Sequence, residues 1–184
     1  MRLSPFVLAA VMLAAAVSPS LAARFRVVRP AGEGAAHVLI DGRLNPHDSR
    51  RFETLLERLR RENTPVALVA LNSPGGYVVE GLAIAELVRL RRIDTYVAGM
   101  CASSCFNVFA AGANRLASRE ASIGVHMAFT PDGPSAEGTA AMVDLALRCG
   151  APQTVIAKMK ATAAPKISWL TLADMQAMHV RVTP

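Results

Sequence analysis

The sequence predicts a mixed α/β domain with a largely parallel sheet. Apolar, strand-like runs cover residues 66–71, 95–99 and 121–127, and the first two each lead into a turn of small residues and then a helix-like segment. Strands that alternate with helices are typical of parallel sheets. The chain has 184 residues, of which 52% are hydrophobic and 18% are charged. This composition suits one domain with its own core.

The first residues have the features of a secretory signal peptide. After a positive start, an apolar run covers residues 6–17, and Ser20 and Ala22 fit a signal peptidase site. The run is shorter than the roughly 20 residues of a spanning helix, although an uncleaved membrane anchor is the alternative. We therefore expect a signal peptide at residues 1–22, a single domain at residues 23–184, and an exported protein that is periplasmic or secreted.

The first expected unit is a strand at residues 37–42 followed by a helix. Asp48 can cap this helix, and the prolyl segment at residues 63–65 ends it. Spacings of three and four residues place one apolar face on the helix. That face consists of Phe52, Leu55, Leu56 and Leu59.

The second expected unit begins with the strand at residues 66–71. This run is continuously apolar, as in strands that are covered on both faces. It leads directly into the sequence NSPGG at residues 72–76, and helical spacing resumes at Val78. The unit is therefore strand, glycine turn and helix.

The third unit repeats this order. A strand at residues 95–99 leads into the turn CASS at residues 101–104 and a buried helix at residues 106–111, and a further strand covers residues 121–127. The remaining chain is less regular. It is expected to contain a loop at 130–138, helices at 140–147, 153–160 and 171–178, and a last strand at 179–182.

The chain is basic, with a net charge of +6 and a pI near 9.9. Such a charge suits nucleic acid or a membrane surface, but aromatic residues make up only 5% of the chain and do not interleave the basic ones. We expect solvated helix faces and no nucleic-acid partner. The arginines of these two patches are Arg50, Arg51, Arg58, Arg60 and Arg61, and Arg89, Arg91 and Arg92.

The chain has three cysteines, Cys101, Cys105 and Cys149. An exported protein can hold a disulfide, so one cysteine is left over or pairs between chains. If Cys101 begins a helix, Cys105 lies one turn away, near the upper limit of disulfide geometry. Cys149 paired with either of them is then at least as plausible. Three cysteines in two places, without a histidine cluster, do not form a zinc site, and no metal is expected.

The residues around the CASS turn could support nucleophilic catalysis. Ser103 or Ser104 stands at a strand-to-helix turn, where a helix N-terminus offers free backbone N–H groups. A serine also needs a base and an oxyanion hole. His126 follows the next strand, and Gly75 and Gly76 can expose backbone amides because they have no Cβ.

Three segments resemble the Clp peptidase family of the Clp/crotonase superfamily. They are NSPGG before a helix, GMCASSCFNVFAAGA and GVHMA, and the resemblance covers about residues 37–130. It implies a Clp/crotonase-like fold of repeated strand-turn-helix units. It also implies that Ser103 is the nucleophile, that His126 is the base, and that the amides of Gly76 and Ser104 form the oxyanion hole. No cofactor is expected.

The resemblance ends before the third member of the family's catalytic triad. The family has an aspartate shortly before a C-terminal helix that resembles LTLADMQAM here, and the matching stretch KATAAPKIS contains no acid. The nearest alternatives are Asp132, Asp144 and Asp174. A Ser–Lys dyad, as in related envelope peptidases, is another alternative. Lys158, Lys160 and Lys166 are available for it.

The segment between His126 and the last helix is also shorter than in the Clp peptidase. In the family this region holds two rings together, so a stacked double ring is not expected, although a homo-oligomer is. An exported location would also exclude ATP and the ATP-dependent unfoldase.

The leading hypothesis is an exported, ATP-independent Clp-like serine peptidase or hydrolase with a Ser–His dyad, acting on peptides or unfolded chains. The main alternative is a catalytically inactive envelope protein that keeps the fold as a binding or assembly module. Acyl-thioester chemistry of the crotonase kind would need a coenzyme pocket for which the sequence gives no sign.

Overall fold

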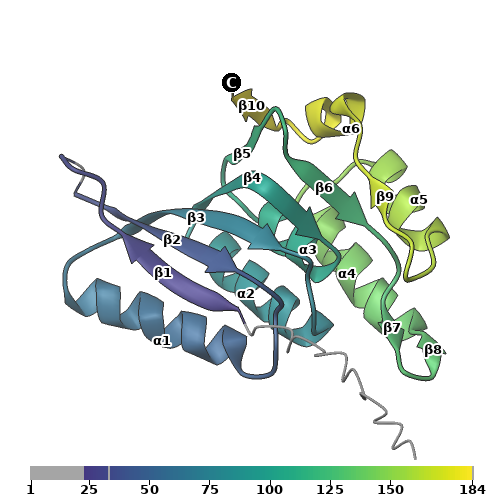
Figure 1. Ribbon diagram of the computed structural model, residues 1–184, viewed down its shortest axis with the longest axis horizontal. Helices are drawn as coiled ribbons and strands as arrows, with labels where there is room; N and C mark the ends of the chain where they lie inside the picture. Colours follow the sequence, from purple (N-terminus) through teal and green to yellow (C-terminus); the bar gives the residue numbers. More distant parts are fainter. Residues whose placement is uncertain (1–22, 33, 184) are drawn as a thin grey trace, which may run out of the picture.

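The computed structural model describes residues 23–32 and 34–183, and the expected signal peptide lies outside them. A mostly parallel sheet forms the centre of the structure (Figure 1). Its main path runs in the order β1-β2-β3-β4-β5-β10, and β6 pairs with β4 and β9. The strands are β1 (Arg24–Val28), β2 (Ala36–Asp41), β3 (Val66–Ser73), β4 (Asp94–Ala102), β5 (Arg115–Ser118), β6 (Ser122–Val125), β9 (Ser168–Trp169) and β10 (Arg181–Thr183).

Only β1 and β9 run antiparallel to their partners in this sheet. The expected largely parallel α/β sheet is thus confirmed. The helices α1 (Asp48–Arg61), α2 (Val78–Leu90), α3 (Ser104–Ala110) and α4 (Ala136–Arg148) follow one another along one face of the sheet (Figure 1). The helices α5 (Gln153–Ala161) and α6 (Leu172–Ala177) lie beside β6 and β9 (Figure 1).

The core lies between the sheet and this helix layer. Phe52 and Leu59 of α1 are fully buried, as are Val69 of β3 and Ile84 of α2. The period of three and four residues in α1 therefore predicts its buried face well, with Leu55 at the edge of that face and only partly buried.

The start of α1 differs from the sequence prediction. His47, in the left-handed conformation at φ 75°, is the N-cap, and Asp48 is the first helical residue. The carboxylate of Asp48 instead accepts a hydrogen bond from the backbone N–H of Asn45 at 2.8 Å. The backbone amides of His47 and Ser49, at the start of the helix, donate hydrogen bonds to the carboxylate of Glu80 in α2. The prediction that Asp48 caps the helix is wrong because a residue distant in sequence supplies the acceptor.

Several strands were not expected. In β1, Phe25 alternates with exposed arginines and packs on Phe52 with 5.9 Å between the ring centroids. The short strands β5 and β9 were not expected either. The loop expected at residues 130–138 contains a small hairpin of β7 (Phe129–Thr130) and β8 (Gly133–Pro134). It also contains the start of α4, which Ser135 caps by accepting from the N–H of Gly138 at 3.0 Å.

The arginine patches lie on the exposed faces of α1 and α2, where acids pair with several of them. Glu57 binds both Arg60 and Arg91, and Glu86 binds Arg89 and Arg148. Many of these arginines lie in the last turns of helices, where cations are favoured by the helix dipole. Within residues 23–32 and 34–183, no helix is long and apolar enough to cross a membrane.

Candidate active site

The expected site segments meet at one edge of the sheet. Strands β3, β4 and β6 are parallel neighbours, so their carboxyl ends lie side by side. Ser73 pairs with Cys101, and Ala102 pairs with Gly124. The NSPGG turn, the CASS turn and His126 follow directly from these paired residues. The structure thus places all three segments at the edge where sites of parallel sheets are usually found.

Ser103 has an unusual backbone. It lies between β4 and α3 with φ 59° and ψ −131°, although it carries a side chain. This conformation costs a residue with a Cβ about 1–3 kcal/mol and is found most often at functional sites. Its N–H donates to the carbonyl of Gly124 at 3.1 Å. Its hydroxyl makes no capping hydrogen bond, although Ser103 is the N-cap of α3.

Ser104 differs from Ser103 in both position and surroundings. It is the first residue of α3 and is completely buried, and its Oγ donates to the carbonyl of Gly76 at 3.4 Å. Ser103 retains 8% exposure. The geometry therefore leaves the hydroxyl of Ser103, and not that of Ser104, available to a ligand.

The glycine turn packs directly against the serine turn. Gly75 has φ 85°, and a Cβ there would lie 2.7 Å from the Cβ of Ser103 and 2.6 Å from the carbonyl oxygen of Ala102. Gly76 approaches the backbone of Leu44 even more closely. Only glycine allows this contact.

Two backbone N–H groups at this contact lack an acceptor among the described residues. They belong to Gly76 and to Ser104, the first residue of a helix. The first amides of a helix have no intrahelical partner. Unpaired amides of this kind are the donors from which oxyanion holes are built.

His126 is 6% exposed and is oriented by its own neighbour in the chain. Its Nδ1 lies 2.7 Å from the carbonyl oxygen of Met127. A carbonyl only accepts, so Nδ1 carries a proton, and in the neutral ring the lone pair then lies on Nε2. The ring also packs on Phe129 with 5.8 Å between the ring centroids. This is the tautomer that a general base needs.

No carboxylate contacts His126 in the part of the chain that the structure describes. Asp132 is exposed in the β7–β8 hairpin, and Asp144 pairs with Arg148 at 3.0 Å. Asp174 pairs with Lys158 and forms the capping box of α6 with the N-cap Thr171. Burial raises the pKa of Asp174, but hydrogen bonds from Lys158 and Thr171 outweigh it and hold that pKa below the usual range. The three alternative acids thus have other partners or face solvent.

The cysteine pairing is resolved by the position of the turn. Cys101 and Cys105 form a disulfide with their Cα atoms 5.3 Å apart, and Cys149 is a free thiol. If Cys101 began a helix, Cys149 would be at least as plausible a partner. Instead, Cys101 lies in β4, and the tight turn at Ser103 brings it within the ordinary range of disulfide distances.

Comparison with known proteins identifies the family. The Clp protease profile matches residues 35–146, more than half of the chain. The chain belongs to the Clp protease family. It is therefore a Clp peptidase-like protein, as the three sequence segments predict. A search of curated proteins found no match.

A solved structure of the family has the same fold. A ClpP1 point mutant from Listeria monocytogenes superposes with a TM-score of 0.61 over 80% of this chain and 91% of that one, at 17% sequence identity. The expected Clp-like fold is confirmed.

One element of the site has no sequence signal. The group that orients His126 is the backbone carbonyl of Met127, which every residue type possesses. A residue pattern therefore cannot reveal it.

A cavity of about 570 Å³ lies beside Met127. Its lining includes Met127, Pro134, Thr139, Val143, Leu147 and Lys160. The cavity is largely apolar and adjoins the histidine through Met127.

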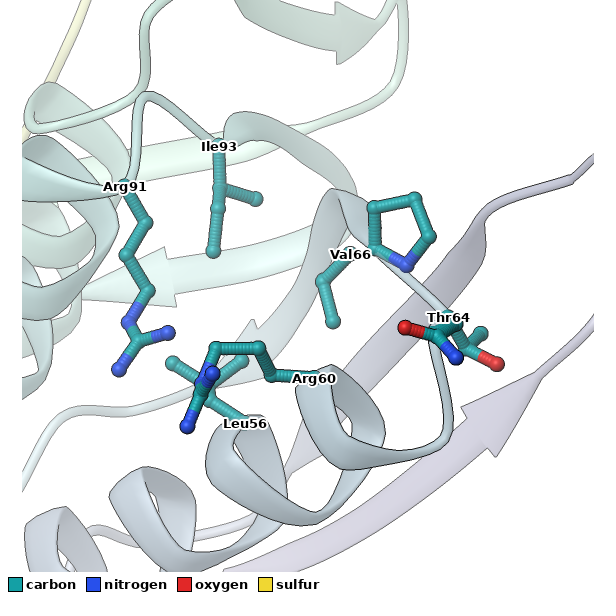
Figure 2. Close-up of a pocket in the computed structure, with 8 residues that line it drawn as sticks. Leu56, Arg60, Thr64, Val66, Arg91 and Ile93 are labelled. Atoms are coloured by element: carbon teal, nitrogen blue, oxygen red, sulfur yellow. The ribbon is translucent and has the colours of Figure 1, made fainter.

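A second cavity lies away from the site. Figure 2 shows Leu56, Val66 and Ile93 with Arg60 and Arg91 around a pocket of about 460 Å³. It lies at the amino ends of β3 and β4, opposite the serine turn. The described residues contain no group of three or more histidine, cysteine or acidic side chains that could hold a metal ion.

Proposed function

We propose that this protein is an exported Clp-like serine peptidase that cleaves peptides or unfolded chains without ATP. The observation that carries the proposal is the strained backbone of Ser103 at the strand-to-helix turn. In nucleophile elbows, a serine at such a turn presents its hydroxyl clear of the main chain. Membership of the Clp protease family agrees with this role.

In the proposed reaction, Ser103 attacks the carbonyl carbon of the peptide bond. His126 takes the hydroxyl proton on Nε2 and later gives it to the leaving amine. The amides of Gly76 and Ser104 donate to the oxyanion of the tetrahedral intermediate. Water then repeats these steps on the acyl-enzyme and releases the second product.

The Met127 carbonyl orients the His126 ring, which is one of the two roles of the acid in a full triad. It keeps the proton of the neutral ring on Nδ1, which leaves Nε2 as the basic nitrogen of the proposed dyad. A carbonyl carries only a partial negative charge, so it stabilises the imidazolium less than a carboxylate does. We therefore expect a working dyad with a lower rate than a full triad.

The proposal includes a location outside the cytoplasm. The signal-peptide pattern of residues 1–22 supports export, and residues 23–184 would then act outside the cytoplasm as one domain. ATP is absent there, so no ATP-dependent unfoldase would assist. An extended substrate would pair with the backbone beside the glycine turn, and self-association into a homo-oligomer is part of the same proposal.

A second candidate function is a binding or assembly module that has kept the fold. It is favoured by the absence of a carboxylate at His126 among the described residues and by the low exposure of Ser103. In that case the serine turn would hold a peptide without cleaving it.

The deciding experiment is labelling with a fluorophosphonate probe, which reacts with activated serines. We expect the protein beginning at Ala23 to be labelled, Ser103→Ala to abolish labelling, and His126→Ala to slow it by about 100-fold. Ser104→Ala is the matched control, because it removes a neighbouring hydroxyl but keeps the backbone amide. Labelling that persists in Ser103→Ala, or is absent from the wild type, would exclude the peptidase mechanism.

A further inference from the structure

The disulfide between Cys101 and Cys105 spans the turn that carries Ser103. We propose that this disulfide holds the backbone of Ser103 in its reactive conformation. Cys101 and Cys105 are then positioning residues for the nucleophile, and the oxidised chain is the reactive form. The inference rests on the proposed function, because it assigns a role to the neighbours of the proposed nucleophile.

Both halves of the disulfide are anchored in rigid parts of the structure. Cys101 is fully buried in β4, where it pairs with Ser73 on one side and Ile123 on the other. Cys105 is 1% exposed and is the second residue of α3. The bond therefore ties the central sheet to the helix across the three residues that form the turn.

Besides the disulfide, the turn is restrained by packing against Gly75 and by the hydrogen bond from the Ser104 hydroxyl to Gly76. The N–H of Ser103 donates to Gly124 at 3.1 Å, and the carbonyl of Ser103 accepts from Phe106 at 2.9 Å. The hydroxyl of Ser103 does not cap the helix, and the amide of Ser104 has no acceptor among the described residues. The proposed reaction needs both of these groups free.

These free groups explain why a covalent restraint is useful here. A helix start is usually held by a capping side chain and by partners for its first amides. At α3 the proposed reaction needs the Ser103 hydroxyl for attack on the substrate and the Ser104 amide for binding the oxyanion. The disulfide supplies a restraint that occupies neither group, at a residue whose own backbone preference opposes the observed φ.

Loss of the disulfide should allow Ser103 to relax towards negative φ. That change would move its Oγ and the Ser104 amide, and a displacement of about 1 Å can cost about 100-fold in rate. The cavity beside Met127 lies on other elements and would remain. The chemical step should therefore slow while binding of the probe changes little.

The test measures fluorophosphonate inactivation of the Cys101→Ala/Cys105→Ala variant, with the rate constant (kinact) and the binding constant (KI) determined separately. We expect kinact to fall by about ten-fold or more and KI to stay within about two-fold. Cys149→Ala is the matched control, since it removes a thiol without touching the disulfide, and it should behave as wild type. If the alanine pair does not fold, Cys101→Val with Cys105→Ala restores buried volume.

Reduction of the wild type gives a second route to the same state. Dithiothreitol transfers two electrons and two protons to the disulfide, giving two cysteine thiols, and itself becomes a cyclic disulfide. The reduced wild type should match the double variant, which should not respond to dithiothreitol. An oxidised and a reduced wild type with the same kinact would overturn the proposal and leave the proposed function intact.

Hydrogen exchange tests the same restraint without relying on activity. Reduction should speed exchange of the Ser103 and Phe106 amides by about ten-fold or more and leave the amides of α1 unchanged. Faster exchange at these two amides without any labelling would support the restraint and refute the peptidase proposal. Unchanged exchange at both amides would overturn the positioning role whatever the labelling result.

Discussion

Both turns at the candidate site contain residues with positive φ, but they supply different chemical groups. In the turn after β3, Gly75 and Gly76 adopt positive φ, as glycine readily does. In the turn after β4, Ser103 adopts positive φ at an energetic cost. The first turn supplies backbone amides, so it needs no side chain. The second supplies a hydroxyl, so it must carry a side chain where glycine would be easier.

The two shortest helices of the described chain begin in different ways. Helix α6 begins with a capping box, in which Thr171 and Asp174 satisfy each other's backbone amides. Helix α3 has no side-chain cap, and the Cys101–Cys105 disulfide lies across its start. An ordinary helix start is stabilised by polar side chains. A start that must keep its polar groups free for chemistry needs another restraint.

The largest expected effect concerns the glycine turn. In Gly76→Ala the new Cβ would lie 2.0 Å from the carbonyl oxygen of Leu44, which is backbone and cannot turn aside. We expect the free energy of unfolding in urea to fall by about 3 kcal/mol or more.

The control for this change is Gly150→Ala. Gly150 also has positive φ, at 81°, but apart from its chain neighbours no atom of the described residues lies within 4 Å of its added Cβ. The free energy of unfolding of Gly150→Ala should fall by only about 1 kcal/mol, which is the cost of the backbone conformation alone. Equal losses at the two positions would contradict the close contact between Gly76 and Leu44.

A smaller effect is expected at the cap of α6. The carboxylate of Asp174 accepts from the N–H of Thr171 at 2.7 Å and from its hydroxyl at 2.8 Å, and it pairs with Lys158. Asp174→Asn keeps the shape but loses the charge. It should lower the free energy of unfolding at pH 7 by about 1–2 kcal/mol.

The effect of Asp174→Asn should also depend on pH. The pKa of this carboxyl is lower in the folded chain than in the unfolded chain, because Lys158 and Thr171 outweigh its burial. Its stabilisation is then present above the unfolded pKa and is lost as the pH falls through the folded pKa. Urea unfolding of both proteins between pH 7 and pH 3 should show the difference narrowing with acid. A constant difference would assign the effect to packing.

The smallest effect measures the strain in the serine turn itself. Ser103→Gly and Ser103→Ala both remove the hydroxyl, but only glycine accepts φ 59° without cost. We expect the glycine variant to be more stable in urea than the alanine variant by about 1 kcal/mol. An alanine variant that is as stable as the glycine one would show that the turn is not strained.

The sequence alone predicts the repeated strand-turn-helix units, because long apolar runs and three- and four-residue spacings reflect burial directly. It also predicts which segments share an edge, since the carboxyl ends of neighbouring parallel strands meet. Arg24–Val28 escaped prediction because its arginines alternate with only two buried-face residues, Phe25 and Val27. The weak pattern becomes a strand only when β2 supplies hydrogen bonds and Phe52 supplies an apolar surface.

The details of the site depend on tertiary structure. The turn at Ser103 packs against Gly75 and donates a hydrogen bond to Gly124, and both of these residues are distant in sequence. The pairing of Cys101 with Cys105 follows from the sharpness of the same turn. Residue types and spacing determined which groups reach this edge of the sheet. Only the folded backbone decided how they face one another, because hydrogen bonds to carbonyls and contacts of a few ångströms leave no pattern in the sequence.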